Sequence, residues 1–295
     1  MRWRRLRRRP GGVIDRRGQA ASTGYGGRGL GGIPVGGGVG AVILLVVVVF
    51  VFQLCSGGGF GIPGAPDLGG ADEAPRGRSG PSEEGTRSQF VEAVVDDIQT
   101  MWDEDIFRPA GRTYRDTSVV LFTDRTDSDC GVASAATGPF YCPADGLVYL
   151  DLGFFRELDQ RFRAPGDFAQ AYVIAHEIGH HVQTLLGTNE AVQRESRDNP
   201  SERNELSVRL ELQADCYAGV WAASVYARDV LQPGDIEEAL TAAAAVGDDR
   251  IQERTQGRID PETFTHGTSE QRVTWFRTGF DSGDPNACET FDAEI

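Results

Sequence analysis

The chain has 295 residues, of which 40% are hydrophobic and 25% are charged, and its formal net charge is −15. This length and apolar content predict one sizeable folded domain with appendages rather than several domains. The charge is distributed unevenly: residues 1–54 hold nine arginines and one acid, a balance of +8, so the total of −15 leaves −23 for the remainder. A basic head on an acidic body indicates a membrane partner and argues against nucleic-acid binding.

An apolar run follows the basic head. Residues 35–54 include 41–52, in which no side chain is charged or polar. Twenty helical residues span about 30 Å, the thickness of a bilayer's hydrocarbon core. We therefore predict a single transmembrane helix over 35–54 that contacts membrane lipid. Because arginines beside a span favour the cytoplasmic side, the N-terminus is expected in the cytoplasm and the rest of the chain on the outer face of the cell membrane.

Two other interpretations of residues 35–54 are open, namely a cleaved signal peptide and a buried strand. The long basic segment and the absence of an A-x-A site argue against cleavage, although the small residues at 56–58 keep that alternative open. The two residues before Cys55 lack the small side chains that lipoprotein processing needs. Cys55 is therefore interpreted as an incidental thiol.

Residues 55–88 are rich in Gly, Pro, Ser and charge and have almost nothing to bury, so they are predicted to form a disordered linker. The folded domain is expected to begin at Gln89, because apolar residues recur at helical spacing from Phe90 towards Trp102. The predicted organisation is a basic cytoplasmic segment (1–34), a transmembrane helix (35–54), the linker (55–88) and the domain (89–295).

Short β-prone runs at 118–122 and 147–150 predict two strands separated by a loop over 123–146. The rest of the domain shows helical patterns, the first of which Asp167 can cap and Gly187 can end. The expected fold class is α+β, a mainly helical domain with a small sheet. The predicted helices in this part of the chain cover 167–186, 207–223, 236–246 and 269–279.

The stretch H-E-I-G-H at 176–180 lies inside the first of these helices. Histidines four residues apart lie one turn apart on one helix face, so both can reach a single cation while Glu177 stands beside the open coordination position. A polar face that arose by chance is the other interpretation. The pattern predicts a zinc site with His176 and His180 as ligands and Glu177 as general base.

A catalytic zinc site needs a third protein ligand and an open position for water. Gln183 and Leu186 stand where the metzincin pattern requires glycine and histidine, which excludes that subclass. Glu211 and Asp215 lie one turn apart on the predicted helix 207–223 and offer an alternative. Glu211 would be the third ligand, and Asp215 would accept the outer N–H of a zinc-bound histidine. An ordinary solvated acidic pair is the competing interpretation.

The run Glu211-Leu212-Gln213-Ala214-Asp215 after H-E-x-x-H is similar to the glutamate-zincin pattern, and the chain resembles the bacterial putative neutral zinc metallopeptidase family. The resemblance spans nearly the full length. It implies a zincin-like fold and a membrane-anchored zinc peptidase with ligands at His176, His180 and Glu211, but little about the substrate. The other segments that carry it are 1–3, 15–18, 138–143, 148–151, 172–183 and 266–272.

Beyond Cys55, four cysteines remain, at Cys130, Cys142, Cys216 and Cys288. An even number on the outer side of a membrane predicts two disulfides. We expect Cys130 to pair with Cys142 and Cys216 with Cys288, while other pairings stay open. A second, structural metal site is disfavoured because the spacing contains no C-x-x-C.

Hydrolysis also needs a donor to the oxyanion that forms at the attacked carbonyl. His266 is the first candidate, because it precedes a predicted helix and the chain has only four histidines. A capping or core role for His266 is equally open, and Arg272 and Tyr217 are alternative donors. His181 lies about 100° around the helix from its neighbour His180 and is expected to lie outside the metal site.

The predicted function is a membrane-anchored zinc endopeptidase that holds one catalytic Zn²⁺ and hydrolyses peptide bonds in protein or peptide substrates. The alternative is a catalytically silent zinc-binding module that holds a partner protein at the membrane. Glu177 favours the enzyme, because binding alone needs no general base. By analogy with zincins, a strand beside the catalytic helix can pair with an extended peptide. No obligate protein partner is inferred.

Overall fold

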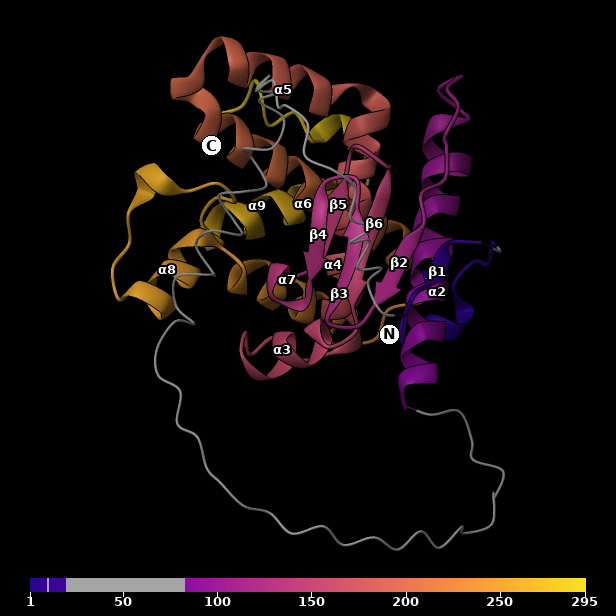
Figure 1. Cartoon of the computed structure of the whole chain (residues 1–295). Helices are drawn as coiled ribbons and strands as arrows, with labels where there is room; N and C mark the ends of the chain where they lie inside the picture. The colour runs from indigo at the N-terminus through magenta and orange to yellow at the C-terminus, as the bar shows by residue number, and fades with distance from the viewer. Residues whose placement is uncertain (10, 20–82) are drawn as a thin grey trace, which may run out of the picture.

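A computed structural model of the chain describes residues 1–9, 11–19 and 83–295 (Figure 1). The predicted transmembrane helix at 35–54 and residues 55–82 of the predicted linker lie outside these ranges. Within them, no helix combines the length and apolar character that crossing a bilayer requires. The described residues form a mainly helical domain with a small sheet, as the α+β prediction expected.

The main sheet has four strands in the order β1-β2-β6-β5. The first three run parallel, and β5 is antiparallel to β6. Every residue of β2 is buried, which explains its unbroken apolar sequence. The strands are β1 (Val13–Asp15), β2 (Val119–Phe122), β5 (Phe140–Cys142) and β6 (Leu147–Asp151).

The prediction of a loop over residues 123–146 was wrong in part, because this segment contains β5 and a separate two-stranded hairpin. The hairpin pairs β3 (Arg125–Ser128) with β4 (Gly131–Ser134). Its strands are short and mostly polar, so they lack the apolar alternation that signals a strand. The disulfide Cys130–Cys142 joins the hairpin turn to β5.

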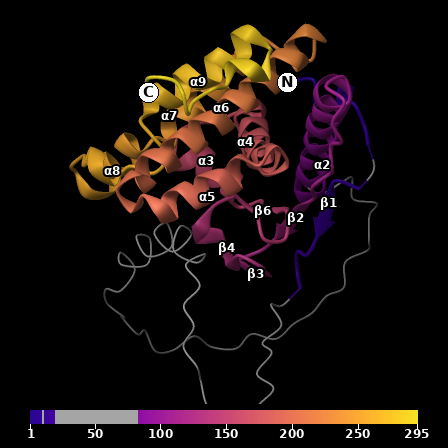
Figure 2. The same ribbon diagram turned by 90° about the horizontal axis from the view of Figure 1, so that it is seen from above.

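The helices α4, α6, α7 and α9 gather on one side of the sheet, as Figure 2 shows. The predicted helices are confirmed, most with longer bounds, and α3, α5 and α8 are additional. The helices are α2 (Glu83–Met101), α3 (Phe154–Gln160), α4 (Asp167–Leu186), α5 (Thr188–Asp198), α6 (Arg203–Ala227), α7 (Asp235–Ala245), α8 (Asp248–Gln256) and α9 (Ser269–Ser282). Short helical turns are η1 (Trp3–Arg5), η3 (Trp102–Phe107), η4 (Ala135–Thr137), η5 (Pro200–Glu202), η6 (Pro261–Thr263) and η7 (Pro285–Ala287).

Small residues bring the site helices close together. A Cβ atom on Gly179, inside the H-E-x-x-H motif, would lie 3.1 Å from the carbonyl oxygen of Ala214 on α6. Between α6 and α9 the approach is tighter, because a Cβ atom on Gly279 would lie 1.9 Å from the Cys216 carbonyl oxygen. The disulfide Cys216–Cys288 adds a covalent tie between α6 and the C-terminal tail. Both predicted disulfides are thus present.

Two expected boundaries need correction. Residues 83–88, assigned to the linker, form the first turns of α2. Residues 1–9 and 11–19, assigned to a separate basic segment, pack on the domain, and β1 extends its sheet. No sequence pattern indicated this packing, because a three-residue strand is too short to show periodicity.

Candidate metal centre

Helix α4 carries both motif histidines. Its C-terminal end is the predicted one, but its N-terminal cap is a different residue from the one expected. Gly166, not Asp167, is the N-cap residue, and the Phe168 N–H donates to the Glu238 carboxylate at 3.0 Å. Asp167 is the first helical residue and pairs with the Met1 ammonium at 2.6 Å. At the other end Gly187 adopts φ 84°, which confirms the predicted stop.

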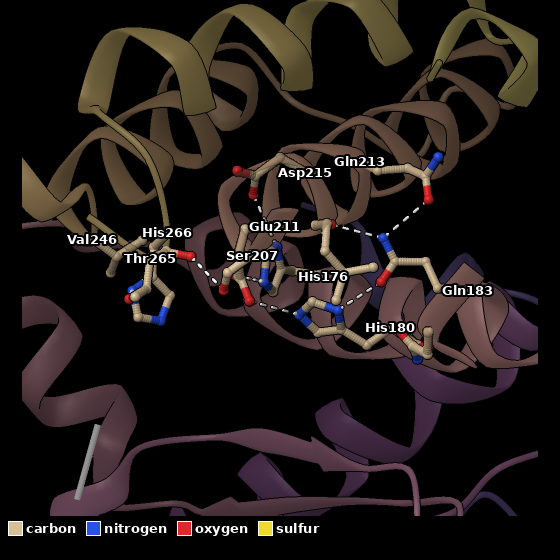
Figure 3. Close-up of polar contacts among 12 residues, drawn as sticks. His176, His180, Gln183, Ser207, Glu211, Gln213, Asp215, Val246, Thr265 and His266 are labelled. Carbon is tan, nitrogen blue, oxygen red and sulfur yellow. Dashed lines mark hydrogen bonds and ion pairs between the residues drawn. The ribbon is translucent and has the colours of Figure 1, made fainter. Parts of the chain in front are cut away.

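Three predicted ligands converge between α4 and α6 (Figure 3). His176 Nε2 lies 3.2 Å from Glu211 Oε2, and His180 Nε2 lies 3.4 Å from Glu211 Oε1. The two imidazole rings stand nearly perpendicular with centroids 4.8 Å apart. The ligand atoms of all three residues lie within 4.8 Å of one another. The predicted trio therefore forms one cluster.

The spacing of this cluster fits zinc. Nitrogen and oxygen ligands bind zinc at about 2.0–2.2 Å, so two ligands at tetrahedral positions lie about 3.4 Å apart. The histidine-to-glutamate separations of 3.2 and 3.4 Å agree with that value. Two imidazoles and one carboxylate are also a donor set of catalytic zinc sites, which leave the fourth position open. His176, His180 and Glu211 can thus hold one zinc ion.

The outer nitrogen of His176 is held by a buried charged network. His176 Nδ1 donates to Asp215 Oδ1 at 2.9 Å, and the Tyr172 hydroxyl donates to the same oxygen. Arg272 binds Asp215 in a bidentate manner at 2.8 and 2.9 Å. Asp215 is fully buried and Arg272 is 3% exposed. Asp215 thus accepts a hydrogen bond from the outer nitrogen of His176, the contact that the helix spacing predicted, whereas the sequence did not reveal its arginine and tyrosine partners.

These charges shift the pKa values of the cluster. Burial lowers the pKa of His176, but the Asp215 carboxylate and the hydrogen bonds to Asp215 and Glu211 outweigh it and raise the pKa to about 10. Burial raises the pKa of Glu211, but the nearby histidines hold it well below its usual range. The metal-free site therefore binds a proton that a metal ion must displace.

The outer nitrogen of His180 is held by a neutral chain of amides. His180 Nδ1 donates to Gln183 Oε1 at 2.8 Å. The Gln183 amide in turn donates to the Leu210 carbonyl at 2.7 Å and to Gln213 Oε1 at 3.1 Å. Gln213 donates to the carbonyl of Cys288 at 3.0 Å. Gln183 lies three residues after His180 on the same helix face, and this spacing could have predicted the hydrogen bond between their side chains.

The candidate base Glu177 is 8% exposed. Across residues 1–9, 11–19 and 83–295, its carboxylate has no hydrogen-bond or ion-pair partner. A buried carboxylate without a protein partner is free to accept a proton from water. The structure thus leaves Glu177 available beside the ligand His176.

His266 lies beside the cluster in the loop before α9 (Figure 3). Its Nδ1 lies 3.1 Å from Asp248 Oδ1, and its side chain is 31% exposed. Asp248 Oδ2 accepts the backbone N–H groups of Thr265, His266 and Gly267, which fixes the loop. Ser207 donates to the Thr265 carbonyl at 2.9 Å, one turn before the ligand Glu211 on α6. The fold therefore places His266 beside the site, as predicted, whereas no sequence pattern indicated its partner Asp248.

The two alternative oxyanion donors are engaged in other contacts. Arg272 is occupied by Asp215, and Tyr217 is 4% exposed and packs edge-on against Trp102. His181 lies outside the cluster as predicted, since its Nε2 is 2.6 Å from the Arg115 carbonyl oxygen. Burial lowers the pKa of His181.

Burial also lowers the pKa of His266, but its hydrogen bond to Asp248 and the Glu211 charge outweigh burial, so that the pKa is raised. In the neutral ring, a proton on Nδ1 leaves Nε2 without one. In the metal-free site this raised pKa favours the doubly protonated ring, in which Nε2 also carries a donor hydrogen.

Comparison with known proteins assigns the chain to a family. The chain matches the family described as putative neutral zinc metallopeptidase over residues 1–291. The chain belongs to that family. The uncharacterized protein YpfJ of Escherichia coli (strain K12) is 44% identical over 296 residues, covering 100% of both chains. The uncharacterized protein Rv2575 of Mycobacterium tuberculosis (strain H37Rv) is 44% identical over 216 residues, or 69% of this chain and 70% of that one. No solved structure matches.

The family resemblance expected from the sequence is thus confirmed over almost the whole chain. The family description agrees with zinc as the metal. Its relatives carry no described activity, so the reaction and the roles of individual residues rest on the geometry of this site.

Proposed function

We propose that this protein is a zinc-dependent endopeptidase in which His176, His180 and Glu211 hold one catalytic ion. The observation that carries the proposal is the convergence of both Nε2 atoms on one glutamate, at 3.2 and 3.4 Å, with both Nδ1 atoms already occupied by other partners. Each imidazole therefore presents one fixed nitrogen to the same point. Such preorganised ligands favour metal binding over a chance polar face.

When bound, zinc supplies Lewis acidity, which makes water a stronger acid and polarises a carbonyl. The chain's own residues supply the proton transfers. Glu177 takes the proton from the attacking water and passes it to the amine nitrogen that leaves when the peptide bond breaks. The protonated His266 ring, oriented by Asp248, donates Nε2–H to the oxyanion. Asp215 and Gln183 keep the ligand rings in place throughout.

The sheet offers a site for an extended substrate chain. β5 is an edge of the main sheet and packs beside α4, whereas the predicted strands β2 and β6 are both interior. A peptide laid along β5 would pair with it through main-chain hydrogen bonds. The proposed substrates are therefore unfolded or extended segments of proteins, and no nucleic acid is involved.

We place the domain in an extracytoplasmic, oxidising compartment, a location that both disulfides favour. Attachment to lipid through residues 35–54 stays a prediction from the sequence, since those residues lie outside the described ranges.

The test is chelator-sensitive cleavage of an unfolded protein by the purified full chain, with activity restored by added zinc. Glu177→Gln is the matched variant, because it removes the base and spares every ligand. It should keep zinc while the cleavage rate falls by at least about 10²-fold. Zinc binding with no hydrolysis of any peptide by the native chain would instead support a zinc-binding module that holds a partner protein.

His266→Gln tests the donor separately. The variant should keep zinc and lower kcat by about 10²-fold or more, because a single oxyanion donor contributes about that much. Unchanged kcat would limit His266 to a structural role in the loop.

A further inference from the structure

The N-terminal arm, residues 1–9 and 11–19, is an integral part of the folded domain. Figures 1 and 2 both show its strand β1 beside α2 and β2. The side chains of Met1 and Leu6 are 7% and 4% exposed and belong to the main core. Trp3 packs edge-on against Phe90 of α2 with ring centroids 6.0 Å apart. Apolar burial of this kind is typical of an intramolecular core and not of a detached tail.

Backbone hydrogen bonds fix the register of the arm. β1 pairs in parallel with β2 over its whole length. The Val119 N–H donates to the Gly12 carbonyl, and the Arg16 N–H donates to the Leu121 carbonyl, both at 2.8 Å. Gly12 also lies against α2, where a Cβ atom would come within 2.7 Å of Val95 Cγ1. These contacts leave the arm one position on the domain.

Five of the nine arginines that predicted a cytoplasmic N-terminus are paired with acids of the domain. Arg2 lies 2.8 Å from Asp229, and Arg7 lies 2.8 Å from Asp105. These exposed pairs contribute little stability individually. Two further contacts reach buried acids: the Arg7 backbone N–H donates to fully buried Asp97 at 2.8 Å, and the Met1 ammonium, 0% exposed, binds buried Asp235 at 3.2 Å.

We infer that the arm and the catalytic domain face the same compartment, which is incompatible with a single membrane crossing between them. The hydrocarbon core is about 30 Å thick, whereas the arm and the domain meet at hydrogen-bond distance. One crossing between residues 19 and 83 would separate them. Exchange of arms between copies does not remove the conflict, because copies of one orientation place every arm on the same side.

This arrangement replaces the expected orientation, in which the N-terminus is cytoplasmic and the domain is outside. The arginine pattern is a statistical guide to orientation, whereas the arm contacts are a direct physical constraint. With the disulfides, they place both ends of residues 20–82 in the oxidising compartment. The inference does not depend on peptidase activity.

Cysteine labelling of the full chain in intact spheroplasts tests the inference. In a Cys55→Ser background, Arg4→Cys reports the arm and Gln193→Cys reports α5, and both positions are exposed. A membrane-impermeant maleimide should label both before lysis, while a cytosolic control protein reacts only after lysis. Labelling of Gln193→Cys alone would overturn the inference and restore the single crossing. Protection of both cysteines would keep the shared compartment but contradict its outer location.

Discussion

The two histidines proposed as zinc ligands have hydrogen-bond partners of opposite character. Behind His176 lies a fully buried ion pair of Asp215 and Arg272, whereas behind His180 lies a neutral chain from Gln183 to Gln213. A carboxylate partner raises the basicity of a ligand histidine, and an amide partner mainly orients it. We therefore expect His176 to bind zinc more strongly than His180, whose amide partner orients the ring without adding charge. Variants on each side can break or sharpen this comparison.

The largest effect is expected at the ligand that both histidines share. Glu211→Ala removes the carboxylate that lies 3.2 Å from His176 and 3.4 Å from His180. Two histidines alone form an incomplete site, so the variant should lose zinc on dialysis and lose all cleavage activity. Metal analysis of dilute protein checks this. Full zinc occupancy in the variant would show that another residue completes the site.

The second-largest effect is expected at Asp215, the charged partner of His176. Asp215→Asn should weaken zinc affinity by about 10–100-fold, because a supporting partner of a ligand is lost. It should also destabilise the fold by about 3–5 kcal/mol, because the buried guanidinium of Arg272 loses its counter-ion. Competition with a zinc chelator measures the first effect, and urea unfolding of the metal-free protein measures the second.

The double variant Asp215→Asn with Arg272→Met is the control that separates these effects. It removes the uncompensated charge, so stability should recover while zinc affinity stays low. If affinity recovered together with stability, the effect of Asp215 on zinc would be an indirect result of the fold.

The smallest effect is expected on the neutral side. Gln183→Leu should lower zinc affinity by no more than about 10-fold, because it removes orientation but no charge. Stability should fall by about 1–3 kcal/mol, since the Leu210 carbonyl and Gln213 lose a donor. Gln183→Glu sharpens the comparison by placing a carboxylate behind His180. It should bind zinc more tightly than Gln183→Leu in the same chelator competition, and equal affinities would contradict the role of partner charge.

Much of this site could be predicted from the sequence, because its ligands follow helical spacing. The i, i+4 histidines define one face of α4, and Glu211 with Asp215 define one face of α6. The supporting partners could not be found in this way. Gln213 meets Gln183 only after α4 and α6 have packed, and Arg272 meets Asp215 only after α6 and α9 have packed. No local pattern encodes these contacts.

The arm shows the same limit in the fold. Its arginines suggested a membrane orientation, but their acidic partners on the domain are spread from Asp96 to Asp229 along the chain. A charge pattern shows that partners are needed, and it does not show where they lie. The three-residue strand β1 is visible only through its pairing with β2.

X-ray absorption at the zinc edge of the full chain, purified without added metal, tests the central claim most directly. The account predicts one zinc ion per chain with two imidazole nitrogens and oxygen ligands at about 2.0–2.2 Å, and no sulfur in the coordination shell. The imidazole signal should disappear in protein that carries both His176→Ala and His180→Ala. Sulfur ligands at about 2.3 Å, or zinc that is bound unchanged in that double variant, would contradict the account.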